Sequence, residues 1–268
     1  MRVLSLLPVA LGALVLCHCS ADAGADAPAD EPSSAEEALR YNGGNTGAFL
    51  REMTPAGYSC IRTRLTVPDY TGDEATQGTP WIYFGFGDEA RLDMEVGLAF
   101  QKGNGTAEKP RRYLPYMRLA QTFYFAPETE RVLPTETTEL VARLVGDKVY
   151  LRKDDRPITL KSSAGESITF LRVPGLEASR THVRRVVGQA TRVMDYRGTR
   201  LGTLGPVVFD GTRVCDARGD EGPFTGSVAS YSRTVNGVTH GTSVWPARYV
   251  SRTRSGAGGE REEVWLFR

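Results

Sequence analysis

The side chains best placed to do chemistry are three charged residues at alternate positions of one segment: Arg91, Asp93 and Glu95. The positions between and after them, 92, 94 and 96, are all apolar. Successive side chains of a strand point to opposite faces of a sheet, so this alternation predicts a charged row on one face and a core-facing row on the other. The charged row is either a binding or catalytic surface or a solvated sheet face. If it is catalytic, Glu95 and then Asp93 are the candidate residues.

Other catalytic and metal-binding patterns are poorly supported. Beyond residue 23 the only histidines are His182 and His240, and neither lies near a G-x-S-x-G nucleophile motif. No Cys-x-x-Cys pair or Cys/His cluster occurs, so we expect no metal site and no cofactor. The turn with Asp69, Asp73 and Glu74 offers oxygen ligands for calcium, but without the alternating pattern of an EF-hand loop it indicates a solvated acidic turn more readily.

One further motif is the adhesion tripeptide Arg218-Gly219-Asp220. A match of three residues arises easily by chance in a chain of 268 residues. With no other support in the sequence, we interpret it as a chance match.

The first 23 residues have the pattern of an export signal. One arginine precedes an apolar run too short to span a membrane, and Ala21-Asp22-Ala23 supplies the small-residue pattern for cleavage after position 23. Cys17 and Cys19 leave a second interpretation open, a lipoprotein signal that ends before a lipidated cysteine. Both predict an exported bacterial protein, secreted or in the cell envelope, with membrane attachment only through such a lipid anchor.

Residues 24–40 predict a disordered acidic tether that is rich in Ala, Pro and Ser. Residues 1–40 carry two arginines and six acidic side chains, whereas the whole chain is at +1, so residues 41–268 carry about +5. A modest positive charge spread over a domain of this size is weak evidence for any partner. No nucleic-acid motif occurs, and we do not expect nucleic acid as a partner.

Two cysteines remain after the signal segment, Cys60 and Cys215. Exported chains with two cysteines usually pair them, so we expect a disulfide that joins early and late strands of one domain. The alternative is two buried free thiols.

From residue 41 onward, short apolar or alternating segments are separated by Gly, Asn, Asp and Pro, which predicts strands and turns. Gly146-Asp147 and Asn236-Gly237 predict tight hairpins. The only helical pattern is Ser34–Leu50, which glycines interrupt. Many strands without helices predict an all-β fold, a single β-sandwich or jelly-roll domain over residues 41–268. The expected strands are 57–67, 79–87, 92–102, 112–119, 122–127, 138–146, 148–153, 166–172, 182–195, 206–210, 226–235, 238–245 and 263–267.

The charged row has a counterpart in jelly-roll glucanases of the laminarinase type, which carry catalytic carboxylates as E-x-D-x-E on one strand. The comparable positions here are Arg91-x-Asp93-x-Glu95. The first carboxylate, the nucleophile of that family, is replaced by arginine. An arginine beside Asp93 also favours its ionised form, which weakens it as an acid.

A broader resemblance is to the glutamic peptidases (eqolisins), exported enzymes of concanavalin A-like fold. It rests on WIYFGFGDEARLDMEVGLAF and on HVRRVVGQATRVMDYRGTRLGTLGPVVFDGTRV. Similar patterns occur in secreted bacterial proteins of the same fold. Glu95 stands where that family has its catalytic Gln, and Arg184 stands near its catalytic Glu, followed by Arg185 where the family has Trp. The resemblance therefore implies the fold and a possible Glu95–Arg184 pair, but the catalytic positions are not preserved.

Aromatic residues near the charged row would suit sugar stacking or core filling. Those considered are Trp81, Tyr83, Tyr113 and Tyr116. The residues expected to bind a ligand are two of these aromatic residues, the three charged residues of the row, and one arginine of the stretch that begins HVRRVV. They are Arg91, Asp93, Glu95, Tyr83, Tyr116 and Arg184.

Three functions remain open. The first is a non-catalytic, lectin-like or envelope binding module, monomeric, that binds a glycan, a cell-wall polymer or a peptide. The second is an acid hydrolase, a peptidase or glycosidase, with Glu95 as its essential carboxylate. The third is a structural protein of the cell envelope, whose charged strand is only a solvated or salt-bridged face.

Overall fold

The computed structural model describes residues 46–70, 79–87, 94–103, 106–120, 122–191, 202–228, 231–235, 238–242 and 250–266. These residues fall in the second of two units of the chain, Pro32–Arg268. The predicted export signal and tether lie outside the described residues. The described residues form strands and two single-turn 3-10 helices, η1 (Glu128–Glu130) and η2 (Ala178–Arg180), and they include no helix long and apolar enough to cross a membrane.

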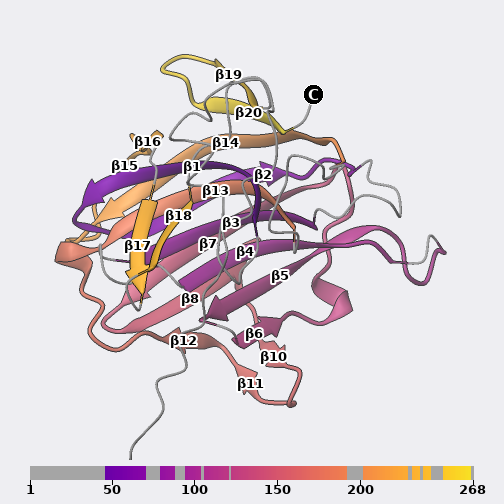
Figure 1. The fold of residues 1–268 in the computed structure, drawn as a ribbon, viewed down its shortest axis with the longest axis horizontal. Helices are drawn as coiled ribbons and strands as arrows, with labels where there is room; N and C mark the ends of the chain where they lie inside the picture. Colours follow the sequence, from indigo (N-terminus) through magenta and orange to yellow (C-terminus); the bar gives the residue numbers. More distant parts are fainter. Residues whose placement is uncertain are drawn as a thin grey trace, which may run out of the picture. The chain divides into compact units, whose positions relative to one another are not determined.

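The first large sheet, sheet A, contains nine strands whose neighbours are antiparallel (Figure 1). Sequence-distant strands β3 and β13 lie side by side near its middle. In spatial order the strands are β11 (Ser167–Ile168), β10 (Leu160–Ser162), β6 (Thr122–Phe125), β5 (Arg112–Leu119), β4 (Met94–Gln101), β3 (Thr79–Gly87), β13 (His182–Thr191), β1 (Thr46–Ala56) and β16 (Ser227–Val228).

The second large sheet, sheet B, is also antiparallel. Its main path is β12 (Phe170–Arg172), β8 (Lys148–Lys153), β7 (Thr137–Val145), β2 (Tyr58–Thr66), β14 (Leu204–Asp216), β20 (Arg261–Leu266) and β19 (Val250–Ser255). Two short strands extend it, since β15 (Glu221–Pro223) pairs with β14 and β9 (Arg156–Pro157) pairs with β8. A separate hairpin joins β17 (Tyr231–Val235) and β18 (Val238–Thr242).

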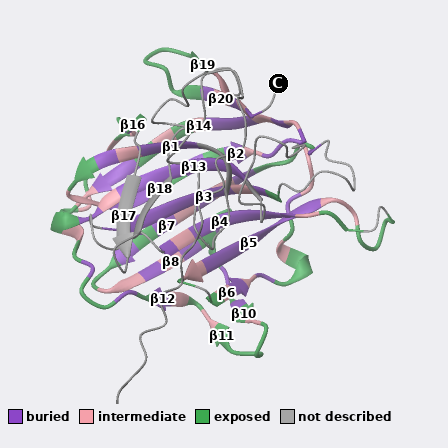
Figure 2. Cartoon of the chain, in the orientation of Figure 1, coloured by how far each residue is buried: buried purple, intermediate pink, exposed green. Residues whose placement is uncertain are grey.

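The two sheets pack face to face around one main hydrophobic core, so the predicted all-β sandwich is confirmed. Alternate residues of the long strands enter this core: Ile82 and Phe84 from β3, for example, belong to the same buried cluster as Ile61 and Leu65 from β2. Figure 2 shows that buried residues, in purple, predominate along β3, β4 and β5, whereas many turn residues are exposed. Burial of this apolar surface is the main driving force for the fold.

The predicted core-facing row of β4 is confirmed where it is described. Met94 and Val96 belong to the main core, and Leu92 lies outside the described residues. The hairpin predicted at Gly146-Asp147 joins β7 to β8. Strands β17 and β18 pair on either side of Asn236-Gly237, although these two residues lie outside the described ranges.

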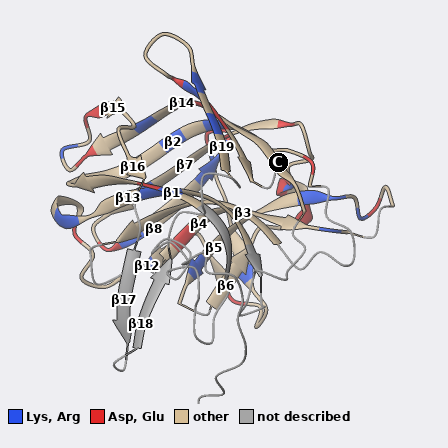
Figure 3. Cartoon of the chain, turned by 45° about the horizontal axis from the view of Figure 1, so that its top comes forward, with Lys and Arg blue, Asp and Glu red and all other residues tan. Residues whose placement is uncertain are grey.

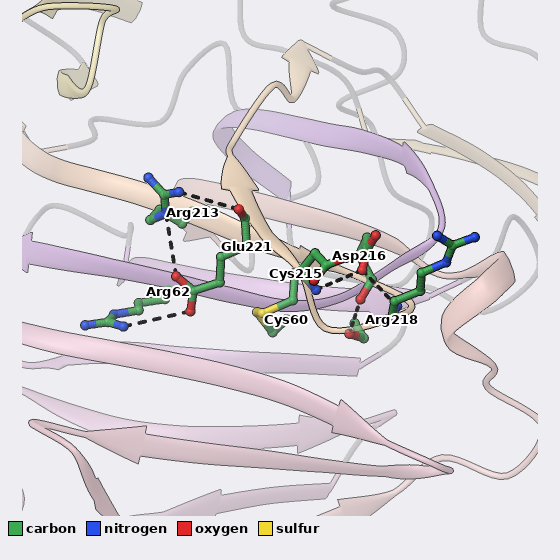
Figure 4. The surroundings of a disulfide bond; sticks show 9 residues. Cys60, Arg62, Arg213, Cys215, Asp216, Arg218 and Glu221 are labelled. Carbon is green, nitrogen blue, oxygen red and sulfur yellow. Dashed lines mark hydrogen bonds and ion pairs between the residues drawn. A yellow bond between two sulfur atoms is a disulfide. The ribbon is translucent and has the colours of Figure 1, made fainter.

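The predicted disulfide is present between Cys60 and Cys215 (Figure 4). The two residues lie directly opposite each other on β2 and β14, with their Cα atoms 4.8 Å apart. They are separated by 155 positions in the chain, so the bond closes a long loop. In the chain-entropy model such a closure stabilises the folded state by about 4 to 5 kcal/mol.

The prediction of helical structure up to Leu50 is wrong for its described part. Residues from Thr46 onward form β1, which pairs with β13 on one side and β16 on the other. The edge strand β19 was also not expected from the sequence. Both strands carry charged residues at positions that turn out to be buried or paired, and these charges hide the apolar alternation by which a strand is recognised.

A buried arginine, Arg185 of β13, lies between two buried carboxylates, Glu52 of β1 and Glu262 of β20. The exposed fractions of these side chains are 3%, 2% and 5%. Arg185 Nε donates a hydrogen bond to Glu52 Oε2 at 3.1 Å, and its Nη2 contacts both carboxylates. The guanidinium carbon lies 4.2 Å from the ring centroid of Phe209 and 4.8 Å from that of Phe224.

Two arginines of the edge strand β19 complete this network. Arg252 Nη2 lies 2.9 Å from Glu52 Oε1, and Arg252 Nε lies 2.6 Å from Glu262 Oε1. The second contact is an ion pair that lacks hydrogen-bond geometry. Arg254 lies 2.8 Å from Glu52 Oε1 and 3.3 Å from Glu262 Oε2. Buried carboxylates require partners because their removal from water is costly. The network supplies them and ties β1 and β13 of sheet A to β19 and β20 of sheet B.

Elsewhere the charges are spread out. Figure 3 shows basic and acidic residues interspersed along the described strands, without a broad region of one sign. Many of them form exposed pairs, such as Arg62 with Glu139 on sheet B. Pairs of this kind contribute little to stability because water already solvates both groups.

Replacement of the central arginine tests the network. We expect Arg185→Leu to lower the free energy of unfolding by about 3 to 5 kcal/mol, because Glu52 and Glu262 would stay buried without it. Urea unfolding at neutral pH with the disulfide intact measures the change. The matched control is Arg62→Leu, which removes a half-exposed ion pair and should cost about 0 to 1 kcal/mol. Equal losses in the two variants would contradict this account.

Candidate functional site

The candidate site lies on the face of sheet A that points away from the main core, which we call the second face. It carries a second, smaller buried cluster made by Tyr83, Ala99, Tyr116 and Val186. These residues alternate with the core-facing ones along β3, β4, β5 and β13. The predicted row on β4 belongs to this face, and of its three members only Glu95 is described. Arg91 and Asp93 lie outside the described residues.

Glu95 is held by two donors from the neighbouring strand β5. Its register partner Arg118 donates from Nη1 to Glu95 Oε1 at 2.8 Å, and Tyr116 Oη donates to Oε2 at 3.1 Å. The side chains of Glu95 and Arg118 are 13% and 22% exposed, so the pair lies near the surface of the site. Arg118 Nε also donates to the carbonyl of Ala120 at 2.6 Å, which fixes the direction of its guanidinium. Both carboxylate oxygens are therefore engaged.

Two glycines create room for the large side chains on this face. A Cβ atom at Gly97 would lie 2.5 Å from Tyr83 Cα, and a Cβ at Gly85 would lie 2.0 Å from Arg184 Nε. Gly97 pairs in register with Tyr83 on one side and Tyr116 on the other, whereas Gly85 pairs with Arg184. Gly85 thus lets the Arg184 side chain lie close against the sheet, and Gly97 lets the backbone of β3 approach closely.

Two buried arginines lie beside Tyr83. Arg184 donates from Nη2 to the carbonyl of Met94 at 2.9 Å, and its guanidinium carbon is 5.8 Å from the Tyr83 ring centroid. Arg51, from β1, is buried and hydrogen-bonds Tyr83. Sequence reasoning considered a pair of Glu95 with Arg184. In the structure the ion-pair partner of Glu95 is Arg118, and Arg184 contacts the backbone next to Glu95.

Burial shifts the ionisation of the tyrosines on this face. The pKa of Tyr116 is raised well above its usual value, first because the side chain is buried and then because the Glu95 carboxylate is close. Burial, followed by the charge of Glu95, also raises the pKa of Tyr83. Burial lowers the pKa of Arg51, with neighbouring Arg184 acting in the same direction. Tyr116 is therefore a protonated hydroxyl donor to Glu95 at any moderate pH.

An aromatic platform adjoins the Glu95–Arg118 pair. It consists of the partly buried Trp81, Phe123 and Phe125, which pack on the second cluster. The rings of Phe123 and Phe125 are stacked with centroids 6.0 Å apart, and the Trp81 centroid lies 5.8 Å from that of Phe123. Arg118 lies over the Phe123 ring at 5.2 Å. The platform thus presents flat apolar surface beside an ordered charge pair.

The four aromatic residues considered for sugar stacking lie on different sides of sheet A. Trp81, Tyr83 and Tyr116 lie on the second face, whereas Tyr113 fills the main core. Burial raises the pKa of Tyr113 strongly. Core filling is therefore the role of Tyr113. Tyr83 and Tyr116 are buried within the second cluster, and of the four only Trp81 is partly exposed.

Sequence reasoning missed several residues of the site: Arg51, Arg118, Phe123 and Phe125. For Arg118 a signal existed, because it follows Tyr116 by two positions and so shares its face of β5. Its pairing with Glu95 depends on the register between β4 and β5, which the sequence does not show. Of the possible calcium turn, Asp73 and Glu74 lie outside the described residues, and Asp69 faces Arg111 at 3.5 Å.

The number of carboxylates on this face limits the reactions that it could catalyse. Among the described side chains of sheet A that lie on the second face, Glu95 is the only carboxylate, because Glu52 of β1 points into the main core. General acid–base hydrolysis of a glycoside uses two carboxylates. Within the described ranges no group of three His, Cys, Asp or Glu side chains could hold a metal ion. What the described residues provide is aromatic surface, one carboxylate and several guanidinium groups.

A comparison with protein-family models finds no match, and neither does a comparison with curated proteins. Solved structures with a similar fold include scytalido-glutamic peptidase bound to a transition state analog inhibitor, at 11% identity and a TM-score of 0.49, over 82% of this chain and 98% of that one. SCP-B of the eqolisin peptidases is similar at 10% identity and a TM-score of 0.41, over 82% and 98%. A glycoside hydrolase family 16 endo-glucanase from Bacteroides ovatus is similar at 9% identity and a TM-score of 0.35, over 59% and 76%.

These are the two families that the sequence resembles, and both have jelly-roll folds. Identities near one tenth leave the function to be argued from the residues of this chain.

The raised pKa of Tyr116 gives a testable pH dependence. Its folded pKa lies above the ordinary value of about 10, so its contribution to stability is complete below about pH 10 and is lost as the pH rises further. Above that pH, wild type should lose about 1.4 kcal/mol of stability per pH unit from this residue, and Tyr116→Phe should not. Urea unfolding of both proteins between neutral and alkaline pH measures the difference. Parallel stability curves would contradict it.

Proposed function

We propose that this chain is a non-catalytic, lectin-like binding protein that holds a glycan on the second face of sheet A. A sugar ring stacks on the aromatic platform of Trp81, Phe123 and Phe125, and its hydroxyl groups bond to the Glu95–Arg118 pair. The observation that carries the proposal is the position of this ordered charge pair beside partly exposed, stacked aromatic rings.

The platform suits a sugar because each face of a pyranose ring has apolar C–H groups that pack on an aromatic ring, while its hydroxyls need polar partners at the rim.

The charge pair supplies the polar side of the same site. Each oxygen of Glu95 accepts one hydrogen bond, from Arg118 or Tyr116, and a carboxylate can accept about four in total. The free acceptor positions suit sugar hydroxyls. Because Arg118 is held by Glu95, by the Ala120 carbonyl and by the Phe123 ring, its guanidinium is ordered before ligand arrives. An ordered site loses less entropy on binding.

Binding is favoured over hydrolysis by the state of Glu95. Arg118 and Tyr116 each hold one oxygen of Glu95 in a fixed direction, which suits a residue that orients a ligand. No second carboxylate accompanies it on the described part of the second face. Glu95 is accordingly proposed as a ligand-orienting residue, in place of the hydrolase alternative.

We also propose that the protein acts outside the cytoplasm, either secreted or attached to the cell envelope. The disulfide supports this, since such bonds persist in oxidising compartments, as does the signal pattern of residues 1–23. A peptide or a cell-wall polymer is the alternative ligand, and a purely structural envelope role is the alternative to binding.

Removal of one platform ring tests the site. We expect Phe123→Ala to weaken retention on a polysaccharide or glycan array by about 10-fold or more, because truncating a stacked ring removes about 1 to 3 kcal/mol of contact. The matched control is Phe170→Ala on sheet B, since Phe170 also packs beside an aromatic residue, Tyr150, and under a cation, Lys148. Equal binding by the two variants would contradict the proposal. Retention on peptides alone would show that the ligand is a peptide and not a glycan.

The role of the carboxylate is tested by Glu95→Gln. We expect this change to weaken glycan binding by about 10-fold, because a hydrogen bond to a charged group is worth about 1.5 to 3 kcal/mol. Neither wild type nor the variant should release sugar or peptide products across acid and neutral pH. Glu139→Gln, which alters an ion-paired glutamate of sheet B, is the control. Turnover by wild type that Glu95→Gln abolishes would establish a hydrolase instead.

A further inference from the structure

The tripeptide Arg218-Gly219-Asp220 forms the tip of a tight turn between β14 and β15, on sheet B and away from the second face of sheet A. The amide of Asp216 donates to the carbonyl of Asp220 at 3.0 Å, and the amide of Gly219 donates to the carbonyl of Asp216 at 3.0 Å. Arg218 and Asp220 are both exposed. The motif therefore lies at the surface of an ordered turn.

Two further features hold this turn in one conformation. The Asp216 carboxylate accepts hydrogen bonds from the amides of Arg218, at 2.8 Å, and Asp220, at 3.0 Å. The preceding residue, Cys215, is bonded to Cys60 on the adjacent strand, and Figure 4 shows Arg218 extending from the turn just beyond the disulfide. A preorganised loop binds more tightly than a flexible one because less entropy is lost on binding.

The fold accounts for one residue of the tripeptide but not for the other two. Gly219 has φ of +96°, a conformation that glycine adopts readily and other residues rarely. Within the described part of the chain, neither the Arg218 guanidinium nor the Asp220 carboxylate forms a hydrogen bond or an ion pair. The two exposed charges thus flank a glycine that the turn requires, and they remain available to a partner.

We propose that this turn is a binding site for a cell-surface adhesion receptor of the RGD-dependent class. The partner is defined by its chemistry: a bound divalent cation that accepts the Asp220 carboxylate as a ligand, and an acidic group that pairs with the Arg218 guanidinium. Carboxylate oxygens are preferred ligands of Mg²⁺ and related ions, and guanidinium groups pair with carboxylates through two parallel hydrogen bonds. The disulfide beside the turn fits a protein that meets such a receptor outside the cytoplasm.

The test uses the full chain immobilised on a surface and, as probe, the purified ectodomain of an integrin that binds linear RGD peptides. We expect binding in the presence of Mg²⁺, its loss on addition of EDTA, and its competition by a soluble linear RGD peptide. Asp220→Glu should weaken binding by about 30-fold or more, the loss typical of a binding hot spot, because it moves the carboxylate by one methylene while keeping charge and backbone contacts.

The control is Asp147→Glu, the same change in the turn between β7 and β8, and it should bind as wild type does. Arg218→Lys is the second variant and should also weaken binding, since lysine cannot form the paired hydrogen bonds of arginine. Thermal unfolding confirms that each variant is folded. The proposal is overturned if wild type shows no Mg²⁺-dependent binding, or if Asp220→Glu and Arg218→Lys both bind as tightly as wild type.

Discussion

The rest of the fold depends on the placement of Arg185 between Glu52 and Glu262. These charges are buried in the sandwich, where an unpaired ion would be strongly destabilising, so the strands that carry them must meet. Sheets A and B are joined there by ionic contacts as well as by apolar packing. The same requirement fixes the orientation of β13, because neighbouring side chains of a strand point to opposite faces. With Arg185 turned into the network, Arg184 must lie on the second face, beside Tyr83.

The second face owes its character to close packing on a sheet with two glycines. Gly85 leaves space that the Arg184 guanidinium fills, and Gly97 allows the backbone of Ile82 and Tyr83 on β3 to approach closely. Glu95 and Arg118 are then brought together by the register between β4 and β5. The aromatic rings next to this pair make the surface neither an ordinary core nor an ordinary solvated face, and this combination is the physical basis for proposing a ligand there.

The sequence was informative where side chains follow the period of the strand. The alternation at positions 94 to 96 predicted which side of β4 enters the core, and the presence of two cysteines after the predicted signal segment predicted their bond. It failed for β1 and β19, where Glu52, Arg252 and Arg254 are charged residues with buried or distant partners. A local pattern cannot reveal that a charge will be neutralised by residues about two hundred positions away. The same limit hid the partner of Glu95, since cross-strand register arises only from the assembled sheet.

The separation of Cys60 from Cys215 has a consequence for the order in which the protein is made. Strand β2 lies between β7 and β14 in sheet B, and β14 leaves the ribosome only after some 140 further residues. During that interval one edge of β2 lacks its partner and Cys60 remains a thiol. Unpaired strand edges are prone to wrong association, and sheets built from distant strands fold slowly. Folding of sheet B can therefore be completed, and the bond closed, only after β14 has been synthesised.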